Sequence, residues 1–338
     1  MNQRLDRLAA RRTDPAVASA KLLNEFYRHL HQSESVRYVI GAMQPIDPEY
    51  TKNTFVQGDR VANQLSKRLK EACEYEYQGS VTNDTHIKAK SDIDLLVIIS
   101  KFFSLEQPQQ PKIPYKGDPL QDLMELRKDA EACLSAAFPE ASVDSSGSTA
   151  LCIEGGSLTR SIDVVPANWY DSNEYEKTKD KVYRGVQVLD CRKKIRIKNT
   201  PFLHNFRIDE KDRRVTGGLR KAARLMKSLK YDSENIELSS YDIVGIAYNM
   251  DDRVLRVPPG HELSILGACL SWCELLEADA ALREGLYVPD GHRKVFCDDH
   301  ATLQGLQQLV RELRGLANDV LNENKRSFQK LAEARVEY

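Results

Sequence analysis

The succession of apolar and polar positions along the chain predicts a mixed region of strands and helices, followed by a mainly helical region. Five consecutive apolar residues at 95–99 are typical of a buried strand. Alternating positions predict further strands at 74–78, 158–165, 186–189 and 195–197, and near Val143 and Leu151. The strands at 186–189 and 195–197 are expected to cover the first layer. Helical spacing of apolar residues predicts helices at 15–31, 54–73, 120–137, 214–231, 240–250, 261–284 and 300–334, and the segment 101–119, rich in Pro, Gln and Lys, predicts an exposed loop.

This order of elements predicts an α+β fold with two domains. A catalytic lobe at 1–211, built from a sheet with flanking helices, would be followed by a helical lobe at 212–338. The length of 338 residues agrees with two domains of about 150 residues each. Ligand sites often lie between domains, so we expect the site in the cleft between the two lobes.

Composition and charge narrow the class of protein. The chain is 41% apolar and 29% charged, which suits a soluble globular protein, and its net charge of −1 argues against broad, tight binding to nucleic acid. Seven cysteines, an odd number scattered through apolar segments, favour a reducing compartment and hence the cytoplasm. The apolar runs are too short for a bilayer and the basic segment 1–12 lacks the apolar core of a signal peptide, so no membrane association is expected.

The strongest chemical signal is a pair of carboxylates at the start of the buried strand. Asp92 and Asp94 lie two positions apart, so on a strand both side chains project from the same face. Adjacent carboxylates repel each other, and a hard cation between them relieves the repulsion. Upstream, the strand at 74–78 ends at Gly79, which allows a phosphate to approach the backbone closely, and Ser80 adds a hydroxyl donor.

A third acid in a neighbouring strand completes the pattern. The glycines at 155–156 predict a hairpin, and Asp163 lies in its returning strand. We expect Asp163 to lie beside Asp92 and Asp94 and to complete a two-metal site with them. In such a site one ion activates the attacking hydroxyl and the other steadies the leaving pyrophosphate. The arrangement therefore predicts metal-assisted phosphoryl or nucleotidyl transfer.

Each part of this pattern has a simpler explanation when it is taken alone. Exposed strand ends often carry acids, and Gly-Ser pairs are mostly turn residues. The ordered set is much less expected by chance, because strand, Gly-Ser, Asp-x-Asp, buried strand and hairpin Asp follow one another in the order that the chemistry requires. The set therefore favours an active site.

Gly-Ser followed by Asp-x-Asp and a later Asp resembles the motif of the polymerase-β-type nucleotidyltransferases. The surrounding residues, Thr-His-Ile at 85–87, Ser-Asp-Ile-Asp at 91–94 and Ile-Asp-Val-Val-Pro-Ala at 162–167, are similar to those of the bacterial cGAS/DncV-like nucleotidyltransferases. The resemblance runs from about residue 35 to about residue 298. It implies a polymerase-β-like core sheet with flanking helices and a helical lobe, in an enzyme that makes cyclic oligonucleotide signals in anti-phage defence.

The resemblance implies a nucleotide-binding role for two segments of the helical region. Helical spacing places Arg220, Arg224 and Lys227 on one ridge, which by itself favours a solvated basic face. The resemblance implies instead that Lys227 binds the triphosphate. Ser240 and Tyr241 by themselves predict a helix start and a core tyrosine, whereas the resemblance implies that Ser240 contacts phosphate and that Tyr241 stacks on a base.

The resulting hypothesis is a nucleotidyltransferase that joins NTPs into a cyclic di- or trinucleotide and releases pyrophosphate. Two Mg²⁺ ions, with Mn²⁺ as a substitute, would bind between the three acids, and the triphosphate would contact Gly79, Ser80, Lys227 and Ser240. The resemblance further implies a separate effector for the product and, as in some relatives, a regulatory protein partner. Base preference, ring size and linkage stay open at this stage.

Two other functions fit the same residues. A synthase of linear oligonucleotides, or an enzyme that transfers a nucleotide to RNA, a small molecule or a protein, would use the same three acids. The near-neutral net charge weighs against an RNA primer. A non-catalytic nucleotide-binding scaffold is disfavoured, because all three acids are present.

A structural zinc site is an alternative role for the cysteines and histidines after residue 268. Cys269 and Cys273 lie one helical turn apart, with His292, Cys297 and His300 later in the chain. The spacing matches no zinc-finger pattern, and the first two cysteines lie on an apolar stripe. We therefore expect these two cysteines to belong to the core.

Overall fold

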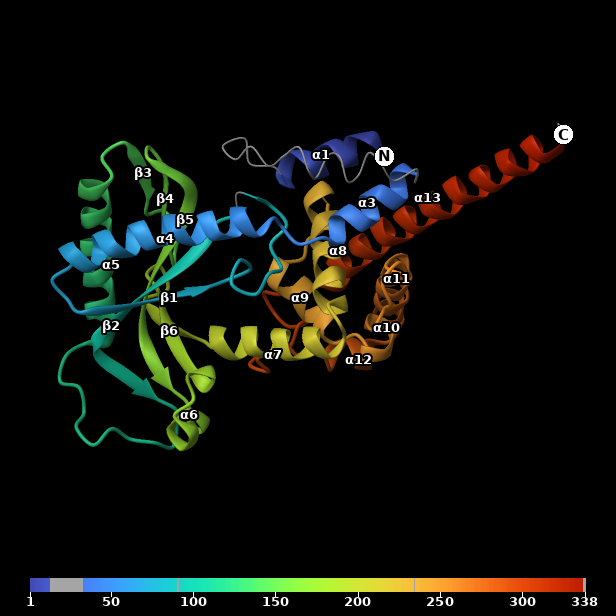
Figure 1. Cartoon of the computed structure of the whole chain (residues 1–338). Helices are drawn as coiled ribbons and strands as arrows, with labels where there is room; N and C mark the ends of the chain where they lie inside the picture. Colours follow the sequence, from blue (N-terminus) through green and yellow to red (C-terminus); the bar gives the residue numbers. More distant parts are fainter. Residues whose placement is uncertain (13–32, 90, 234, 337–338) are drawn as a thin grey trace. The chain divides into compact units, whose positions relative to one another are not determined.

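The structure of the protein is a computed structural model (Figure 1) that describes residues 1–12, 33–89, 91–233 and 235–336, with side chains up to residue 325. The helix expected at 15–31 lies outside the described residues. The chain forms two compact units. We call them the sheet unit, Asp47–Asp84 and Lys90–Arg207, and the helical unit, Met1–Ile46, Thr85–Ala89 and Ile208–Tyr338.

Strands dominate the first unit and helices the second. The strands are β1 (Cys73–Gln78), β2 (Ile93–Leu105), β3 (Ala141–Asp144), β4 (Leu151–Gly155), β5 (Leu158–Asp171), β6 (Arg184–Asp190) and β7 (Ile195–Asn199). The helices are α1 (Asn2–Arg12), α3 (Glu34–Met43), α4 (Pro48–Arg68), α5 (Pro119–Ala137), α6 (Asn173–Thr178), α7 (Pro201–Arg214), α8 (Gly218–Asp232), α9 (Ser240–Tyr248), α10 (Asp252–Leu255), α11 (Leu263–Ala278), α12 (Ala280–Glu284) and α13 (Leu303–Val336), with a short 3-10 turn, η1, at Lys181–Tyr183.

The sheet unit is built on one mixed sheet of seven strands. Its main order is β1-β2-β5-β4-β3, and β6 and β7 extend it from the second half of β5. β2 and β5 are parallel neighbours, whereas the other pairs are antiparallel. The expectation that 186–189 and 195–197 form a covering layer is wrong, because β6 pairs with β5 and β7 pairs with β6 within the same sheet.

The two faces of the sheet differ in what covers them. α4 and α5 pack on one face, where their apolar side chains form a core with Leu95 and Val97 of β2 (Figure 1). On the opposite face, Leu96 and Ile98 pack with apolar residues of β5 and β6. Because side chains alternate along a strand, Asp94 shares the face of Leu96 and points away from α4 and α5.

The helical unit has a core of its own. Apolar side chains from α1, α3, α8, α9, α11 and α13 form one buried cluster, and α8 contacts each of the other five helices. A buried carboxylate ties the N-terminal helices to α8: Asp232 accepts from Arg11 at 2.5 Å and from the Tyr38 hydroxyl at 2.6 Å. Because a buried charge needs such partners, Asp232 fixes α1 and α3 beside the end of α8.

Several element boundaries differ from the expected ones. α4 begins at Pro48 rather than at residue 54, because Asp47 caps it and proline suits the first helical position. α7 was not predicted, although it also opens with a proline, Pro201. The expected loop at 101–119 is a strand as far as Leu105, because the end of β2 pairs with Trp169–Asp171 of β5.

Other differences concern helices. The single helix expected at 261–284 is two helices, because α11 ends at Ala278 and the Asp279 carboxylate accepts from the Leu282 N–H to start α12. Residues 1–12 and 33–46 belong to the helical unit, and their helices α1 and α3 were not predicted. The division into a catalytic lobe at 1–211 and a helical lobe at 212–338 stays a prediction.

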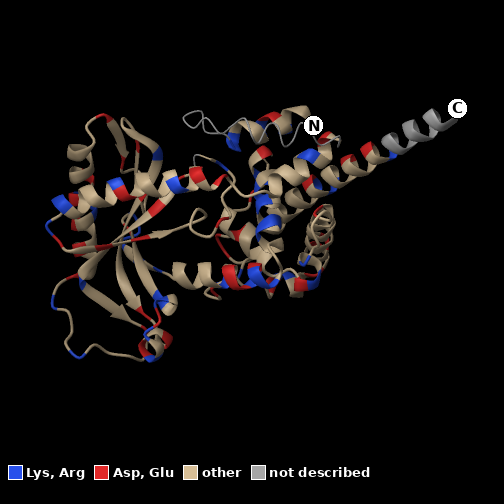
Figure 2. Cartoon of the chain, in the orientation of Figure 1, with Lys and Arg blue, Asp and Glu red and all other residues tan. Residues whose placement is uncertain are grey.

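The distribution of charge agrees with the composition. Acidic and basic residues are intermixed along most of the chain, whereas α8 carries five basic residues and one acid, Asp232 (Figure 2). In the part of the chain that the structure describes, no helix combines the length and the apolar character that crossing a membrane requires.

Candidate active site

The three carboxylates predicted to bind metal lie together at one end of two neighbouring strands. Asp94 of β2 is in register with Asp163 of the parallel strand β5, and both are half-buried. Asp92 lies just ahead of β2 and is exposed. The structure thus brings the acids into one neighbourhood, on the sheet face that α4 and α5 leave uncovered. Their role in catalysis stays a prediction.

The surroundings of these acids disfavour their charged forms. Burial, followed by the charges of Asp163 and Asp92, raises the pKa of Asp94 from 3.8 to about 7. Burial and the charge of Asp92 also raise the pKa of Asp163. Carboxylates in this situation gain free energy by taking up either a proton or a hard cation.

The donor set fits Mg²⁺ or Mn²⁺, because both ions prefer carboxylate oxygens. The three side chains do not yet surround one point. Within residues 1–12, 33–89, 91–233 and 235–336, no three His, Cys, Asp or Glu side chains are arranged closely enough to hold an ion. Because Asp92 is exposed and lies ahead of β2, its side chain would have to turn towards Asp94 and Asp163 for the three acids to share an ion.

Gly79 makes room for Asp94 as well as shaping the turn after β1. Its φ of +88° lies in the left-handed region, which other residues rarely adopt. A Cβ atom at this position would lie 2.0 Å from Oδ2 of Asp94. The sequence suggested only that Gly79 admits a phosphate, whereas the structure shows that its missing side chain leaves space for a predicted metal ligand. Ser80 follows in the same turn and is half-buried.

Residues that the sequence did not indicate hold this turn. The Thr82 hydroxyl donates to the Gly79 carbonyl at 2.7 Å, and the Asn205 amide donates to the Thr82 hydroxyl at 3.0 Å. Asn83 in turn donates to Oδ1 of Asn205 at 3.2 Å. Because Asn205 belongs to α7, far along the chain, no local pattern around the Gly-Ser pair signals its role.

Asp163 also has neighbours that were not anticipated. Cys152 of β4 is directly opposite Asp163 in the antiparallel pair, and its Sγ lies 3.1 Å from Oγ of Ser161. A hydrogen bond from the thiol lowers the pKa of Asp163 and offsets part of the increase caused by burial. The register of β4 with β5 shifts between Ile153 and Gly155, so the turn glycines alone do not identify this neighbour.

We expect the substitution Gly79→Ala to disrupt the acidic site without unfolding the sheet. The new methyl group would overlap the Asp94 carboxylate, and the left-handed φ would cost about 1–2 kcal/mol in addition. Nucleotidyl transfer should fall roughly tenfold, because misplacement of a catalytic group by about 1 Å is enough for such a loss. Gly155→Ala is the matched control, since Gly155 has a φ of +84° but open space around it. Equal transfer rates for the two variants would contradict the role of Gly79.

Lys227 lies on α8 in the helical unit and is 5% exposed. Its Nζ donates to the Thr85 carbonyl at 2.7 Å. Burial, followed by the charges of Arg224 and Lys230, lowers the pKa of Lys227 from 10.5 to about 7. A buried amine close to other cations is charged most readily when an anion binds beside it, which suits a phosphate ligand.

The interpretation of the α8 ridge as a solvated basic face does not hold for Arg224 and Lys227, which are both buried. Arg224 is 4% exposed and donates to the Met43 carbonyl at 2.8 Å. Arg220 is partly exposed and pairs with Asp209 and Asp212. Burial of two cations on one helix is costly, so the ridge requires an explanation beyond solvation.

Ser240 and Tyr241 start α9, which packs against α8. Ser239 is the N-cap: its hydroxyl accepts from the Asp242 N–H at 3.0 Å. Ser240 is the first helical residue and is exposed, at the end of the helix where N–H groups favour anions. Tyr241 is half-buried, and its hydroxyl donates to Asp290 at 3.2 Å. Within the helical unit, these two residues and Lys227 therefore lie on neighbouring helices.

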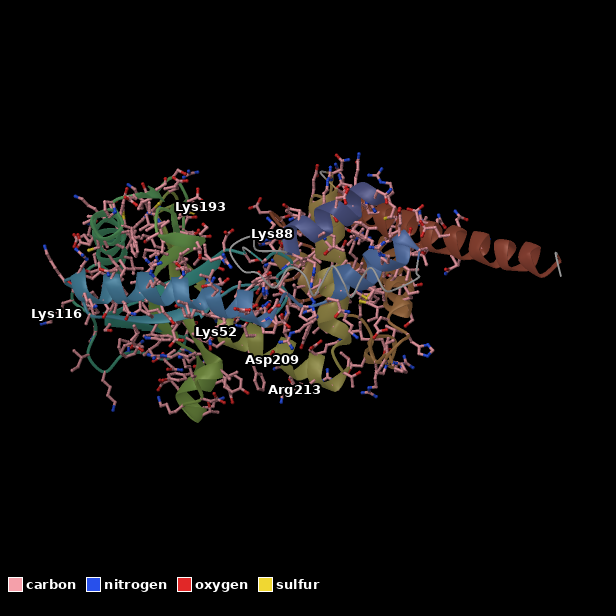
Figure 3. All side chains as sticks on the ribbon, turned by 45° about the horizontal axis from the view of Figure 1, so that its top comes forward. Lys52, Lys88, Lys116, Lys193, Asp209 and Arg213 are labelled. Atoms are coloured by element: carbon pink, nitrogen blue, oxygen red, sulfur yellow. The ribbon has the colours of Figure 1, made fainter. Side chains whose placement is uncertain are left out.

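The segment 85–89 belongs to the helical unit and adds a cation beside α8. Lys88, labelled in Figure 3, has its Nζ 4.3 Å from the centre of the Tyr231 ring. The Arg11 guanidinium approaches the same ring at 5.2 Å. Lys88 therefore lies beside the helix that carries Lys227, while the Arg11 charge is already paired with Asp232.

Cys269 and Cys273, two of the three cysteines considered for zinc, belong to the core, as expected. Cys269 and Cys273 are fully buried in the apolar cluster of the helical unit, and burial raises the pKa of both thiols. Cys297 is exposed. Among the residues that the structure describes, no group of His, Cys, Asp and Glu side chains gathers around these cysteines to hold an ion.

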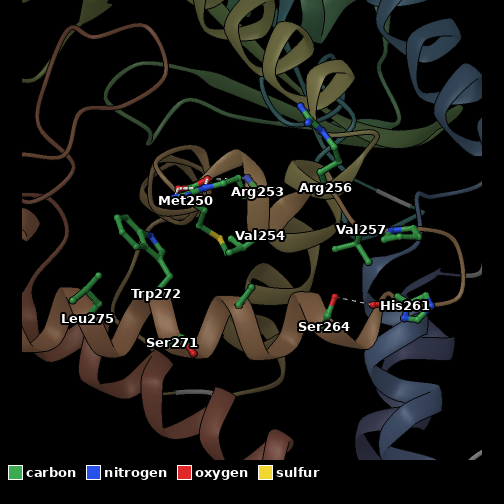
Figure 4. Close-up of a pocket in the computed structure, with 13 residues that line it drawn as sticks. Met250, Arg253, Val254, Arg256, Val257, His261, Ser264, Ser271, Trp272 and Leu275 are labelled. Atoms are coloured by element: carbon green, nitrogen blue, oxygen red, sulfur yellow. Dashed lines mark hydrogen bonds and ion pairs between the residues drawn. The ribbon is translucent and has the colours of Figure 1, made fainter.

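The helical unit also contains a cavity of about 750 Å³, between α11 and the segment that includes α10 (Figure 4). Its walls are largely apolar and include Val254, Trp272 and Leu275. The predicted nucleotide-binding residues do not line it. The cavity is therefore separate from the predicted nucleotide contacts.

No protein-family model matches the chain, but known proteins are similar to it. It is 37% identical over 319 residues to the cyclic dinucleotide synthase CdnE of Yersinia aleksiciae, a match that covers 90% of this chain and 84% of that protein. It is 32% identical over 279 residues to a c-di-GMP synthase of Lachnospiraceae bacterium strain RUG226, covering 73% of this chain and 78% of that protein.

A solved structure extends the likeness to the fold. The STING-associated CdnE c-di-GMP synthase from Capnocytophaga granulosa matches with a TM-score of 0.79 at 27% identity, over 95% of this chain and 98% of that one. The α+β fold expected from the sequence is confirmed, and so is the resemblance stated from the acidic motif.

Proposed function

Because this chain belongs to the CdnE cyclic dinucleotide synthases, cGAS/DncV-like nucleotidyltransferases with a polymerase-β-like core, we propose that it joins two nucleoside triphosphates into a cyclic dinucleotide and releases pyrophosphate. The observation that carries the proposal is the register of Asp94 with Asp163 on parallel strands, beside the turn at Gly79. Paired carboxylates next to a turn whose glycine leaves room for a phosphate suit an in-line displacement at phosphorus.

The acids are assigned to metal binding and to the attacking hydroxyl. Enzymes of this family are generally metal-dependent, and Asp92, Asp94 and Asp163 would hold two Mg²⁺ ions, with Mn²⁺ as a substitute. Bound there, such ions lower the pKa of the attacking hydroxyl and neutralise charge on the departing pyrophosphate. Asp163 is assigned to the side of the attacking hydroxyl, because it lies on β5, whereas Asp94 lies on β2 and Asp92 just ahead of β2.

The remaining site residues are assigned to the nucleotide. Gly79 lets the backbone approach the triphosphate, and Ser80 donates a hydroxyl hydrogen bond to it. Lys227 supplies positive charge, and Ser240 contacts phosphate at the N-terminus of α9. Tyr241 stacks on a base, a contact that orients the base without reading its edge.

The product is proposed to act on a separate effector protein in anti-phage signalling. A signal of this kind separates synthesis from response, so the enzyme itself needs to bind only its NTP substrates. A regulatory protein partner is proposed from the family resemblance, and a cytoplasmic location from the seven scattered cysteines.

Product analysis tests the proposed reaction. The purified protein is incubated with each labelled NTP, alone and mixed, with Mg²⁺ or Mn²⁺, and the products are treated with phosphatase and resolved by chromatography and mass spectrometry. We expect a phosphatase-resistant product with the mass of a cyclic dinucleotide, whose bases then become known. Phosphatase-sensitive ladders would replace the proposal with a linear oligonucleotide synthase. Absence of pyrophosphate from every NTP with either ion would overturn catalysis and favour a nucleotide-binding scaffold.

A further inference from the structure

A short hairpin at 286–296 packs directly on α9, the helix that carries Tyr241. The hairpin is closed by a β-bridge between Tyr287 and Lys294. Val295 is fully buried, and a Cβ atom at Gly245 of α9 would lie 2.8 Å from its side chain. The hairpin therefore rests on α9 at a point where the helix has no side chain, which fixes the two elements relative to each other.

Two residues near the tip of this hairpin hold the ring of Tyr241. The Arg293 guanidinium lies over the ring, 5.1 Å from its centre, a separation at which cation–π attraction operates. The Tyr241 hydroxyl donates to Oδ2 of Asp290 at 3.2 Å. One contact covers a face of the ring and the other holds its edge, so the hairpin determines the orientation of the ring.

Arg293 is itself anchored to α9. Its Nη2 donates to Oδ1 of Asp242 at 2.7 Å, and the Asp242 side chain is 2% exposed. The other carboxylate oxygen of Asp242 accepts from the Ser239 hydroxyl at 2.6 Å. A buried carboxylate with two such bonds holds the guanidinium firmly. The position of Arg293 over Tyr241 is therefore built into the fold.

We propose that Arg293 is a positioning residue for nucleotide binding, which covers one face of Tyr241 and holds the ring in the orientation that stacks on a base. The inference rests on the proposed function, in which Tyr241 stacks on a base. A ring that is already held between Arg293 and Asp290 loses less conformational freedom when the base binds. Arg293 acts through Tyr241 and does not touch the reacting atoms.

The first test compares steady-state constants for the substrate NTP. Arg293→Gln should raise KM roughly 2- to 12-fold, the range that corresponds to the cost of ordering one side chain on binding, while kcat changes by less than about twofold. Arg293→Lys should restore most of the affinity, because an ammonium also pairs with Asp242 and lies over an aromatic ring. Arg314→Gln is the matched control, since it breaks another Arg–carboxylate pair of the helical unit, to Glu274 at 2.8 Å, and should leave KM unchanged. A wild-type KM in Arg293→Gln would overturn the proposal.

A double variant separates positioning from stability. Arg293→Gln alone leaves the buried Asp242 without its cation, which weakens the start of α9. Adding Asp242→Asn removes this charge and keeps an acceptor for Ser239. We expect the Tm of the double variant to recover while its KM stays raised. Recovery of both quantities together would show a purely structural role and would overturn the proposal.

Two further measurements connect the effect to the base. Inorganic tripolyphosphate has no base, so its inhibition constant should be the same for the wild-type protein and Arg293→Gln. In a Tyr241→Leu background, Arg293→Gln should add little to the increase in KM, because both changes remove the same interaction. The inference would be contradicted if Arg293→Gln weakened the binding of tripolyphosphate as much as that of the NTP. It would also be contradicted if the effects of Arg293→Gln and Tyr241→Leu on KM were additive. A wild-type protein that neither binds NTPs nor makes product would instead remove the proposed function, and this inference with it.

Discussion

Substitution of Asp94 by asparagine is expected to abolish cyclic dinucleotide synthesis while the sheet unit stays folded. Asparagine keeps the size of the side chain, but a neutral amide is a much weaker ligand for Mg²⁺ than a carboxylate. Loss of several kcal/mol of transition-state stabilisation corresponds to a decrease in rate of about 10³-fold or more. Asp92→Asn and Asp163→Asn should have the same effect on synthesis.

The same substitution should change how stability depends on pH in the metal-free protein. The pKa of Asp94 is about 7 in the folded state and near 3.8 in the unfolded state, so the folded protein binds the extra proton between these values. The stabilising contribution of protonated Asp94 is therefore complete below about pH 4 and is lost as the pH rises through 7. Its size is at most about 4 kcal/mol, at about 1.36 kcal/mol per pKa unit. The asparagine of the Asp94→Asn variant carries no charge and escapes this loss, so the variant should be the more stable protein at pH 8.

Thermal unfolding with and without Mg²⁺ measures the destabilisation caused by the Asp94 charge and its relief by the ion. At pH 8 the wild-type protein should gain more in Tm from Mg²⁺ than the Asp94→Asn variant does, because the ion relieves repulsion that the variant lacks. Asp144→Asn is a suitable control, since Asp144 is an exposed residue of the same sheet whose carboxylate accepts hydrogen bonds from Ser146. Product formation by Asp94→Asn at the wild-type rate would refute the assignment of the acids.

The placement of Asp94 and Asp163 was predictable because it depends on local geometry. The apolar run at 95–99 identifies the strand that carries Asp94, and the hairpin glycines identify the returning strand that carries Asp163. Alternation along the strand does not place Asp92, because β2 begins at Ile93. β1, β4, α5 and α9 lie close to their expected positions for the same reason, since their apolar patterns span the whole element. These features require only the periodicity of a short segment and its turn residues.

The remaining features depend on contacts between distant segments. The extension of β2 to Leu105 exists because β5 offers hydrogen-bonding partners there, and no property of 101–105 alone predicts it. The burial of Lys227 depends on helices packed around α8, and the contact of Gly79 with Asp94 depends on the register of β1 with β2. Sequence spacing specifies neither packing nor register, so the close neighbours of the predicted residues became visible only in the structure.

Replacement of Lys227 by methionine is expected to lower kcat/KM for the substrate NTP by about 10- to 150-fold. Methionine fills the space of the lysine stem but lacks the ammonium, and hydrogen bonds that involve a charged group contribute about 1.5–3 kcal/mol. The effect should exceed that of Gly79→Ala, because the charge is removed outright rather than displaced. Lys221→Met is the matched control: Lys221 lies on the same helix and pairs with Glu262 at 3.5 Å.

Because the pKa of Lys227 is lowered, the Lys227→Met variant should also differ from the wild-type protein in how the affinity for a triphosphate depends on pH. With a pKa of about 7, the amine loses its charge as the pH rises from 7 to 9, and the affinity for a triphosphate should fall with it. Binding near pH 7 should therefore take up a proton, because the bound anion favours the ammonium form. Calorimetry with a non-hydrolysable NTP, in buffers of different ionisation enthalpy, measures this uptake directly. Lys227→Met should show neither the uptake nor the increase of KM with pH. The same proton uptake in both proteins would assign it to the nucleotide and would remove Lys227 from the triphosphate site.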